Sequence, residues 1–210
     1  MALPKTSSRP APTAKKERKS HQTPIGIACF THLYEPVSLQ DGQPPTYSVL
    51  LVYTPEQKEE LAPLRKLCIR SAKERFGEDE YETLKRRGKM RMPWRNAGEY
   101  EDYGEPFTDG NVMINFKSKE PPGVVDAKAQ PILDKNKVYS GCKMLVSYAP
   151  WAYDQKGNKG VTLLLNNCQK AGEGKRLSGR PDPSEEFEAL EGADDDEDLF
   201  GDEEDDDIPF

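Results

Sequence analysis

Apolar and polar positions alternate over several short stretches of the chain, and a period of two is typical of half-buried β-strands. We predict strands over residues 25–37, 47–53 and 111–117, a short extended piece from Val124, and a β-hairpin formed by residues 138–153 and 160–170. In the first strand, Cys29 and Leu33 fall on one face and Phe30 on the other. Five or six short strands of uneven length favour a small β-barrel over a sandwich.

Between the second and third strands the apolar spacing changes to that of a helix. Thr54, followed by a proline and then Gln57, predicts a helix start, Pro63 predicts a kink or a restart, and Gly77 predicts the end. A second short helix fits residues 79–87, with an acidic capping box at its start. The predicted fold is therefore mainly β, with a helical insertion after the second strand.

The hairpin separates a predicted core row from a row of mixed character. The core row consists of Cys142, Met144, Val146 and Tyr148 on one strand and Val161, Leu163 and Leu165 on the other. The opposite row of the first strand consists of Lys143, Ser147, Trp151 and Tyr153. A lysine with a tryptophan and a tyrosine is unusual for a solvated face and suits base stacking beside a phosphate contact. Pro150 allows a β-bulge at this point, and such a bulge would turn Trp151 inward.

Charge divides the chain into three parts. Residues 1–23 are predicted to form a flexible basic arm, residues 24–180 the folded domain and residues 181–210 a disordered acidic tail. From Ser184 onward the tail carries 15 acids and no base, which leaves 22 of the 37 acids against all 30 bases, a net charge of +8 for the rest. A basic body with an acidic tail is typical of a polyanion binder that carries its own competitor.

The tail ends on an apolar hook behind a run of acids. The residues of this tip are Asp205, Asp206, Asp207, Ile208, Pro209 and Phe210. The hook can enter an apolar pocket while its carboxylate meets a basic rim. The tip resembles the partner-docking end of bacterial single-stranded DNA-binding proteins, so we expect it to bind replication, recombination or repair proteins of phage or host.

The sequence shows no catalytic set, no phosphate-binding glycine loop and no metal-ligand spacing, so we expect no enzyme, no cofactor and no metal. Four widely spaced cysteines are predicted to be buried free thiols. An acidic group within residues 99–109 keeps a metal-dependent nuclease as a minor alternative. No stretch has the length and apolarity of a membrane span, and no secretory signal is evident.

Basic residues alternate with aromatic ones in the segment after the second predicted helix, and cations beside flat rings are what single-stranded nucleic acid binding requires. For Trp94 a role as a plug of the barrel end is an equal alternative. The hairpin tip adds lysines that can wrap over a bound strand. The predicted DNA-binding residues are Lys89, Arg91, Trp94, Arg95, Tyr100, Tyr103, Phe107, Lys117, Lys143, Trp151, Tyr153, Lys156 and Lys159.

Several motifs resemble those of the single-stranded DNA-binding proteins of tailed phages, a family formerly catalogued as a domain of unknown function. They are TYSVLLV at residues 46–52 before the proline-started helix, PPGVVD at 121–126, VYSGC at 138–142, YDQKGNKGV at 153–161 and LNNCQK at 165–170. The resemblance extends over roughly residues 25–180, and the family is more distantly similar to the T7-type phage proteins.

The resemblance implies a single OB-fold, a five- to six-stranded Greek-key barrel with a helix inserted after the second strand. It also implies sequence-tolerant binding of single-stranded DNA (ssDNA) during phage replication and recombination, in the cytoplasm of the bacterial host. The alternative is an acidic-tailed adaptor or chaperone that binds basic proteins and has no DNA groove. Weak binding of duplex DNA through the basic arm also stays open.

Overall fold

The computed structural model describes residues 20–38, 42–155 and 157–177. The expected acidic tail with its tip at Asp205–Phe210, most of the expected basic arm, and Lys156 lie outside these residues. The predicted domain boundaries at residues 24 and 180 therefore stay predictions.

Five strands close into a barrel. They are β2 (Gly26–Val37), β3 (Thr46–Tyr53), β5 (Val112–Ser118), β8 (Asn158–Gly172) and β7 (Lys143–Gln155), in that order around the ring. The ring closes because β7 pairs with β2 as well as with β8. β5 and β8 are parallel, and the other four pairings are antiparallel. This closed five-stranded ring is the predicted OB-fold barrel.

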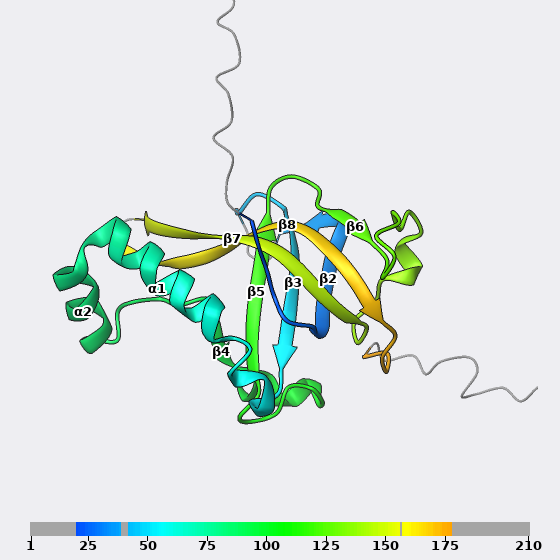
Figure 1. Ribbon diagram of the computed structural model, residues 1–210, viewed down its shortest axis with the longest axis horizontal. Helices are drawn as coiled ribbons and strands as arrows, with labels where there is room; N and C mark the ends of the chain where they lie inside the picture. Colours follow the sequence, from blue (N-terminus) through cyan, green and yellow to red (C-terminus); the bar gives the residue numbers. More distant parts are fainter. Residues whose placement is uncertain (1–19, 39–41, 156, 178–210) are drawn as a thin grey trace, which may run out of the picture. The chain divides into compact units, whose positions relative to one another are not determined.

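Shorter elements surround the barrel (Figure 1). Three small strands pair with strands of the barrel: β1 (His21–Gln22) with β7, β4 (Trp94–Asn96) with β5, and β6 (Gly123–Val125) with β8. The helices are α1 (Ala62–Phe76) and α2 (Glu78–Arg86), and the 3-10 helices are η1 (Pro55–Lys58), η2 (Ala97–Tyr103) and η3 (Lys135–Lys137).

The chain already contacts the barrel before β2 begins. His21 and Gln22 pair with β7, and the Thr23 hydroxyl accepts a hydrogen bond of 3.0 Å from the Val146 amide. Thr23 is buried at 6% exposure. Residues 21–23, which the sequence assigned to the end of the basic arm, thus contact β7 through backbone and side-chain hydrogen bonds.

The barrel interior follows the predicted alternation. The predicted core residues of both hairpin strands are buried, with exposures of 4% or less. They meet Val49, Leu51 and Tyr53 of β3 and Ile114 and Phe116 of β5 in one core cluster. The bulge considered at Pro150 is absent there; the register shifts instead between Ser147 and Tyr148. Trp151 therefore stays on the outer face, opposite Thr162.

A β-bulge interrupts the alternation in β2. Its register with β3 shifts between Cys29 and His32, and Phe30 within this step has a positive φ of 48°. Phe30 is 38% exposed, while Ala28, Cys29 and Leu33 are buried. The extra residue re-aims the side chains that follow it, which is the usual effect of a bulge.

The helical insertion lies between β3 and β5, as predicted. Pro63 stands at the start of α1, so the chain restarts there after η1, and Gly77 ends α1 with a φ of 84°. The predicted capping box of the second helix is wrong: α2 begins at Glu78, and its cap residue, Gly77, has no side chain to bond. Three α1 residues, Leu64, Cys68 and Ala72, belong to the barrel core. Figure 1 shows the far ends of β7 and β8 reaching toward these helices.

All four cysteines are buried and free, as predicted. Burial raises the pKa of the Cys29, Cys68 and Cys168 thiols to about 12, and it also raises the pKa of the Cys142 thiol. These thiols therefore stay protonated and behave as small apolar side chains. In the described part of the chain, no helix has both the length and the apolarity needed to cross a membrane.

Candidate nucleic-acid interface

A second apolar cluster lies on the outer side of β2, β3 and β5. In β3 the side chains of Leu50 and Val52 point away from the barrel core, because they alternate with the inward-facing Val49 and Leu51. The outer cluster consists of Cys29, Leu50, Val52, Ala97, Phe107 and Met113. Ala97 and Phe107 come from η2 and the loop after it, so this segment covers the outer side of the sheet.

Three aromatic rings, those of Phe30, Tyr100 and Tyr103, gather around Phe107 of this cluster, and we call their exposed surface the aromatic face. Phe30 and Tyr103 meet edge to face with centroids 5.6 Å apart, and Tyr100 lies 6.1 Å from Tyr103. Phe107 lies beneath them, 5.7 Å from Phe30 and 6.0 Å from Tyr103. The residues Phe30 and Tyr103 are 38% and 65% exposed. Flat rings held in this way on a rigid barrel can stack on bases.

Phe107 requires a correction. It is only 3% exposed, so its ring cannot receive a base. Its contacts with Phe30, Tyr100 and Tyr103 make it the support on which the exposed rings rest. Burying the most central ring stabilises the orientation of the others.

Cations stand on the same outer side of the barrel. The Arg95 guanidinium lies 5.5 Å from the Tyr100 ring, donates to the Tyr100 hydroxyl at 3.2 Å and pairs with Glu99 at 3.3 Å. Lys143 lies directly opposite Ile27, which contacts the outer cluster. Lys117 lies opposite Ser48 at the other end of the sheet. Arg95, Tyr100, Tyr103, Lys117 and Lys143 are thus the predicted site residues that the fold brings to one outer surface.

Trp94 belongs to the barrel end rather than to this surface. It pairs with the inward-facing Ile114 and contacts the barrel core. The Arg65 guanidinium of α1 lies 5.5 Å from its ring. Of the two roles that the sequence left open, the structure favours the plug, because one face of the ring is covered by protein.

The hairpin and the segment after α2, which carry many of the predicted DNA-binding residues, are hydrogen-bonded to each other where they meet. The Arg91 amide donates to the Lys159 carbonyl at 3.1 Å, and the Val161 amide donates to the Arg91 carbonyl at 2.9 Å. A Cβ at Gly160 would lie 2.5 Å from the Arg91 oxygen, so only glycine allows this approach. Because the segments are hydrogen-bonded together, a DNA strand cannot pass between them here.

Lys159 also requires a correction. Its ammonium group pairs with Glu80 of α2 and with Asp154 at 3.5 Å, and it lies 5.5 Å from the Phe76 ring. The hydrogen bond to Glu80 raises the pKa of Lys159. Its partners come from both helices and from the hairpin, so the side chain joins these elements instead of reaching toward solvent.

The other predicted hairpin residues lie on a different surface. Trp151 is 52% exposed and borders a depression that is formed mainly with α1. The lining residues of this depression are His21, Leu67, Arg70, Ser71, Glu74, Ala149, Pro150, Trp151 and Leu164. Tyr153 lies opposite Gly160 near the bridged segment. The side chains of Lys89 and Arg91 are exposed, and their contact with DNA stays a prediction, as does that of Trp151 and Tyr153.

Sequence reasoning missed Phe30. Alternation gave no sign of its aromatic partners, since Tyr100, Tyr103 and Phe107 lie about seventy residues away in the chain. The bulge and the fold of η2 over β2 bring the rings together. A local pattern contains no information on such a contact.

In the described ranges, no group of three or more His, Cys, Asp or Glu side chains could hold a metal ion.

A protein-family model described as the Enterobacter phage Enc34 ssDNA-binding protein matches residues 27–200, most of the chain. The chain belongs to this family. The resemblance to phage ssDNA-binding proteins expected from the motifs is therefore confirmed. The curated proteins contain no match to the chain.

Two solved structures of phage proteins are similar to this member of the Enc34 family. The ssDNA-binding protein of bacteriophage Enc34, solved in complex with ssDNA, is 18% identical with a TM-score of 0.56, over 79% of this chain and 97% of that chain. The ssDNA-binding protein gp2.5 of bacteriophage T7 is 18% identical with a TM-score of 0.57, over 82% of this chain and 96% of that chain. At such identities the similarity shows the fold, and it agrees with the OB-fold barrel described above.

Proposed function

We propose that this chain is a sequence-tolerant ssDNA-binding protein that coats and protects ssDNA during phage DNA replication and recombination. The observation that carries the proposal is the aromatic face, where exposed rings stand beside cations on the outer side of an OB-fold barrel. Membership in the Enc34 family supports it, since that family is described by ssDNA binding. The proposed activity is binding without catalysis, in the cytoplasm of the host cell.

Bases stack on Phe30 and Tyr103, with Tyr100 as a further platform. Each stacked base contributes about 1–3 kcal/mol, and stacking is tolerant of sequence because every base has a flat face. Arg95, Lys117 and Lys143 neutralise phosphates and release counterions, so affinity falls steeply with salt. Phe107 holds the rings from below, and the barrel supplies the rigidity that keeps them in place.

The acidic tail has two roles in this proposal. Its 15 acids compete with DNA for the basic surface of the folded domain when DNA is absent. When DNA displaces the tail, the tip at Asp205–Phe210 becomes available to replication, recombination or repair proteins. The charge difference between tail and body supports this exchange.

The experiment is fluorescence anisotropy with labelled oligo-dT and a matched duplex, at two salt concentrations. Full-length protein is compared with a chain that ends at Pro183. We expect preferential, salt-sensitive binding of the single strand and tighter binding by the shortened chain at low salt. Equal affinity of both chains at low salt contradicts the role of the tail. Absence of binding by both chains contradicts the DNA-binding function and leaves the adaptor.

A further inference from the structure

Five residues that follow β8 cross the barrel surface beside the aromatic face, and we call residues 173–177 the strap. The strap lies on residues 139–141, with a 2.9 Å hydrogen bond from the Leu177 amide to the Ser140 carbonyl. Two glycines allow the contact: a Cβ at Gly141 would lie 1.8 Å from the Lys175 oxygen, and one at Gly174 would lie 2.1 Å from the Gly141 oxygen. The backbone of the strap is therefore in van der Waals contact with the backbone at Gly141.

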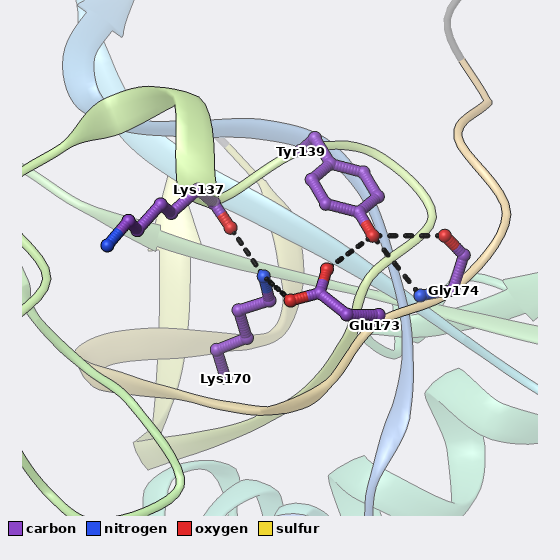
Figure 2. Close-up of polar contacts among 5 residues, drawn as sticks. All are labelled: Lys137, Tyr139, Lys170, Glu173 and Gly174. Atoms are coloured by element: carbon purple, nitrogen blue, oxygen red, sulfur yellow. Dashed lines mark hydrogen bonds and ion pairs between the residues drawn. The ribbon is translucent and has the colours of Figure 1, made fainter. Parts of the chain in front are cut away.

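A polar cluster fastens the strap at its first residues, as Figure 2 shows. Lys170 is only 8% exposed, and its ammonium group donates to the Lys137 carbonyl at 2.7 Å and to Glu173 Oε1 at 2.6 Å. The Tyr139 hydroxyl donates to Glu173 Oε2 at 2.6 Å and accepts from the Gly174 amide at 3.3 Å. The bond from Lys170 lowers the pKa of Glu173, so the carboxylate is charged at neutral pH.

The strap carries two exposed cations, Lys175 and Arg176. The Arg176 guanidinium lies 4.2 Å from the centroid of the Tyr139 ring, so the cluster that fastens the strap also orients this cation. A guanidinium suits a phosphate contact because its planar set of N–H donors matches the geometry of the phosphate oxygens.

The strap borders the aromatic face. Leu177 contacts the outer cluster on which the rings rest. Ser140, whose carbonyl holds Leu177, also accepts a 3.1 Å hydrogen bond from the Phe30 amide through its hydroxyl. Lys143, opposite Ile27 on the outer side, also lies opposite Gly172 at the last residue before the strap. The strap is thus joined to the outer cluster through Leu177 and to the backbone of Phe30 through Ser140.

We propose that the strap is part of the ssDNA site: Lys175 and Arg176 bind phosphates of the strand that stacks on the aromatic face, and Tyr139, Lys170 and Glu173 are positioning residues that hold the strap in place. The inference rests on the proposed function and extends its surface to residue 177. The strap and the acidic tail that follows it in the chain then have opposite effects: the strap strengthens DNA binding, and the acidic tail weakens it.

The first test replaces the strap cations in the full-length protein and measures the dependence of oligo-dT affinity on salt. Each lost phosphate contact lowers the slope of log affinity against log salt by about 0.7, and at about 50 mM salt it weakens binding roughly eightfold. We expect this change for Arg176→Ala and for Lys175→Ala. Lys66→Ala, which removes an exposed cation on α1, is the matched control and should leave the slope unchanged.

The second test uses Tyr139→Phe, which removes the hydroxyl but keeps the ring below Arg176. We expect faster hydrogen exchange of the Leu177 amide and weaker oligo-dT binding with a lower salt slope. Adding Tyr139→Phe to a variant that already carries Lys175→Ala and Arg176→Ala should cause no further loss, because Tyr139 acts through these two cations. A fully additive loss in this triple variant overturns the positioning role.

The outcomes separate the inference from the function on which it rests. If wild-type protein does not bind oligo-dT, the proposed function fails. If it binds, and Tyr103→Ala weakens binding while Lys175→Ala and Arg176→Ala leave both affinity and slope unchanged, the strap inference fails alone. If Tyr139→Phe accelerates exchange at Leu177 without affecting DNA binding, the polar cluster only stabilises the fold.

Discussion

Truncation of Tyr103 separates DNA binding from folding more sharply than any other change on the aromatic face. The ring is 65% exposed and contacts Phe30 edge to face and Phe107 from above. About a third of its surface is covered, roughly 70 Å² of the 200 Å² that such a ring buries in full. At about 25 cal/mol per Å², Tyr103→Ala costs at most about 2 kcal/mol of unfolding free energy.

The expected loss in DNA binding is of similar size. A stacked base contributes about 1–3 kcal/mol, which corresponds to roughly 5- to 150-fold in affinity for oligo-dT. No charge is removed, so the loss should be the same at both salt concentrations, unlike the loss for Arg176→Ala. Phe30→Ala should behave in the same way, because its ring is 38% exposed beside Tyr103.

Two variants serve as controls. Phe107→Ala removes a ring that is 3% exposed and should lower the unfolding free energy by about 3–5 kcal/mol, seen as an early urea transition. Leu133→Ala removes an exposed apolar side chain, 89% exposed, and should change neither property. The assay is anisotropy with oligo-dT on variants whose urea transitions have been measured. If Tyr103→Ala and Phe30→Ala both fold and both bind with wild-type affinity, the aromatic face is not where bases stack.

Four further predictions concern the surrounding structure. Lys159→Ala should lower the melting temperature by releasing α2 from the hairpin, and oligo-dT affinity should stay unchanged; a loss of affinity without a loss of stability would restore Lys159 as a DNA contact. Gly160→Ala should cost about 1–3 kcal/mol in a urea titration, because its Cβ meets the Arg91 oxygen. The four buried thiols should react with a thiol reagent only after unfolding, since burial raises their pKa; rapid labelling of the native protein would contradict this. Because the pKa of Glu173 is lowered, its contribution to the stability of the strap is complete above the ordinary glutamate pKa and is lost as pH falls through the lowered value. Protection of the Leu177 amide against hydrogen exchange, corrected for the intrinsic exchange rate, should therefore decrease over that acidic range.

The strands could be predicted well because their cause is local. Alternation of apolar and polar side chains depends only on the pleat, so the buried rows of β7 and β8 were predicted correctly. Pro63 and Gly77 act through their own backbone geometry, and both marked real helix ends. The capping box was wrong because a helix can start one residue earlier than a side-chain motif indicates, when the chain itself turns at a glycine.

The candidate site was predicted only in part, because its residues meet through tertiary contacts. A lysine in a flexible tip and a lysine paired with a helix have the same local sequence, so Lys159 was predicted as a DNA contact although it pairs with Glu80. Phe107 has the same aromatic character as Tyr103, and only the packing of η2 onto β3 decides which ring is covered. Phe30 was missed because its partners Tyr103 and Phe107 come from a segment about seventy residues away, and no local pattern reveals such a contact.

The sequence by itself determined the class of this protein: the alternating strands, the helical insertion, the motifs of a phage ssDNA-binding family and the separation of a basic body from an acidic tail. These properties depend on residues that are close together in the chain, so the sequence alone reveals them. Only the tertiary structure decided which cations are available and which rings are exposed. It also brought the strap to the aromatic face, since residues 140, 30 and 177 are joined by hydrogen bonds across more than a hundred positions of sequence. Closure of the barrel creates those contacts, and closure is a property of the whole fold.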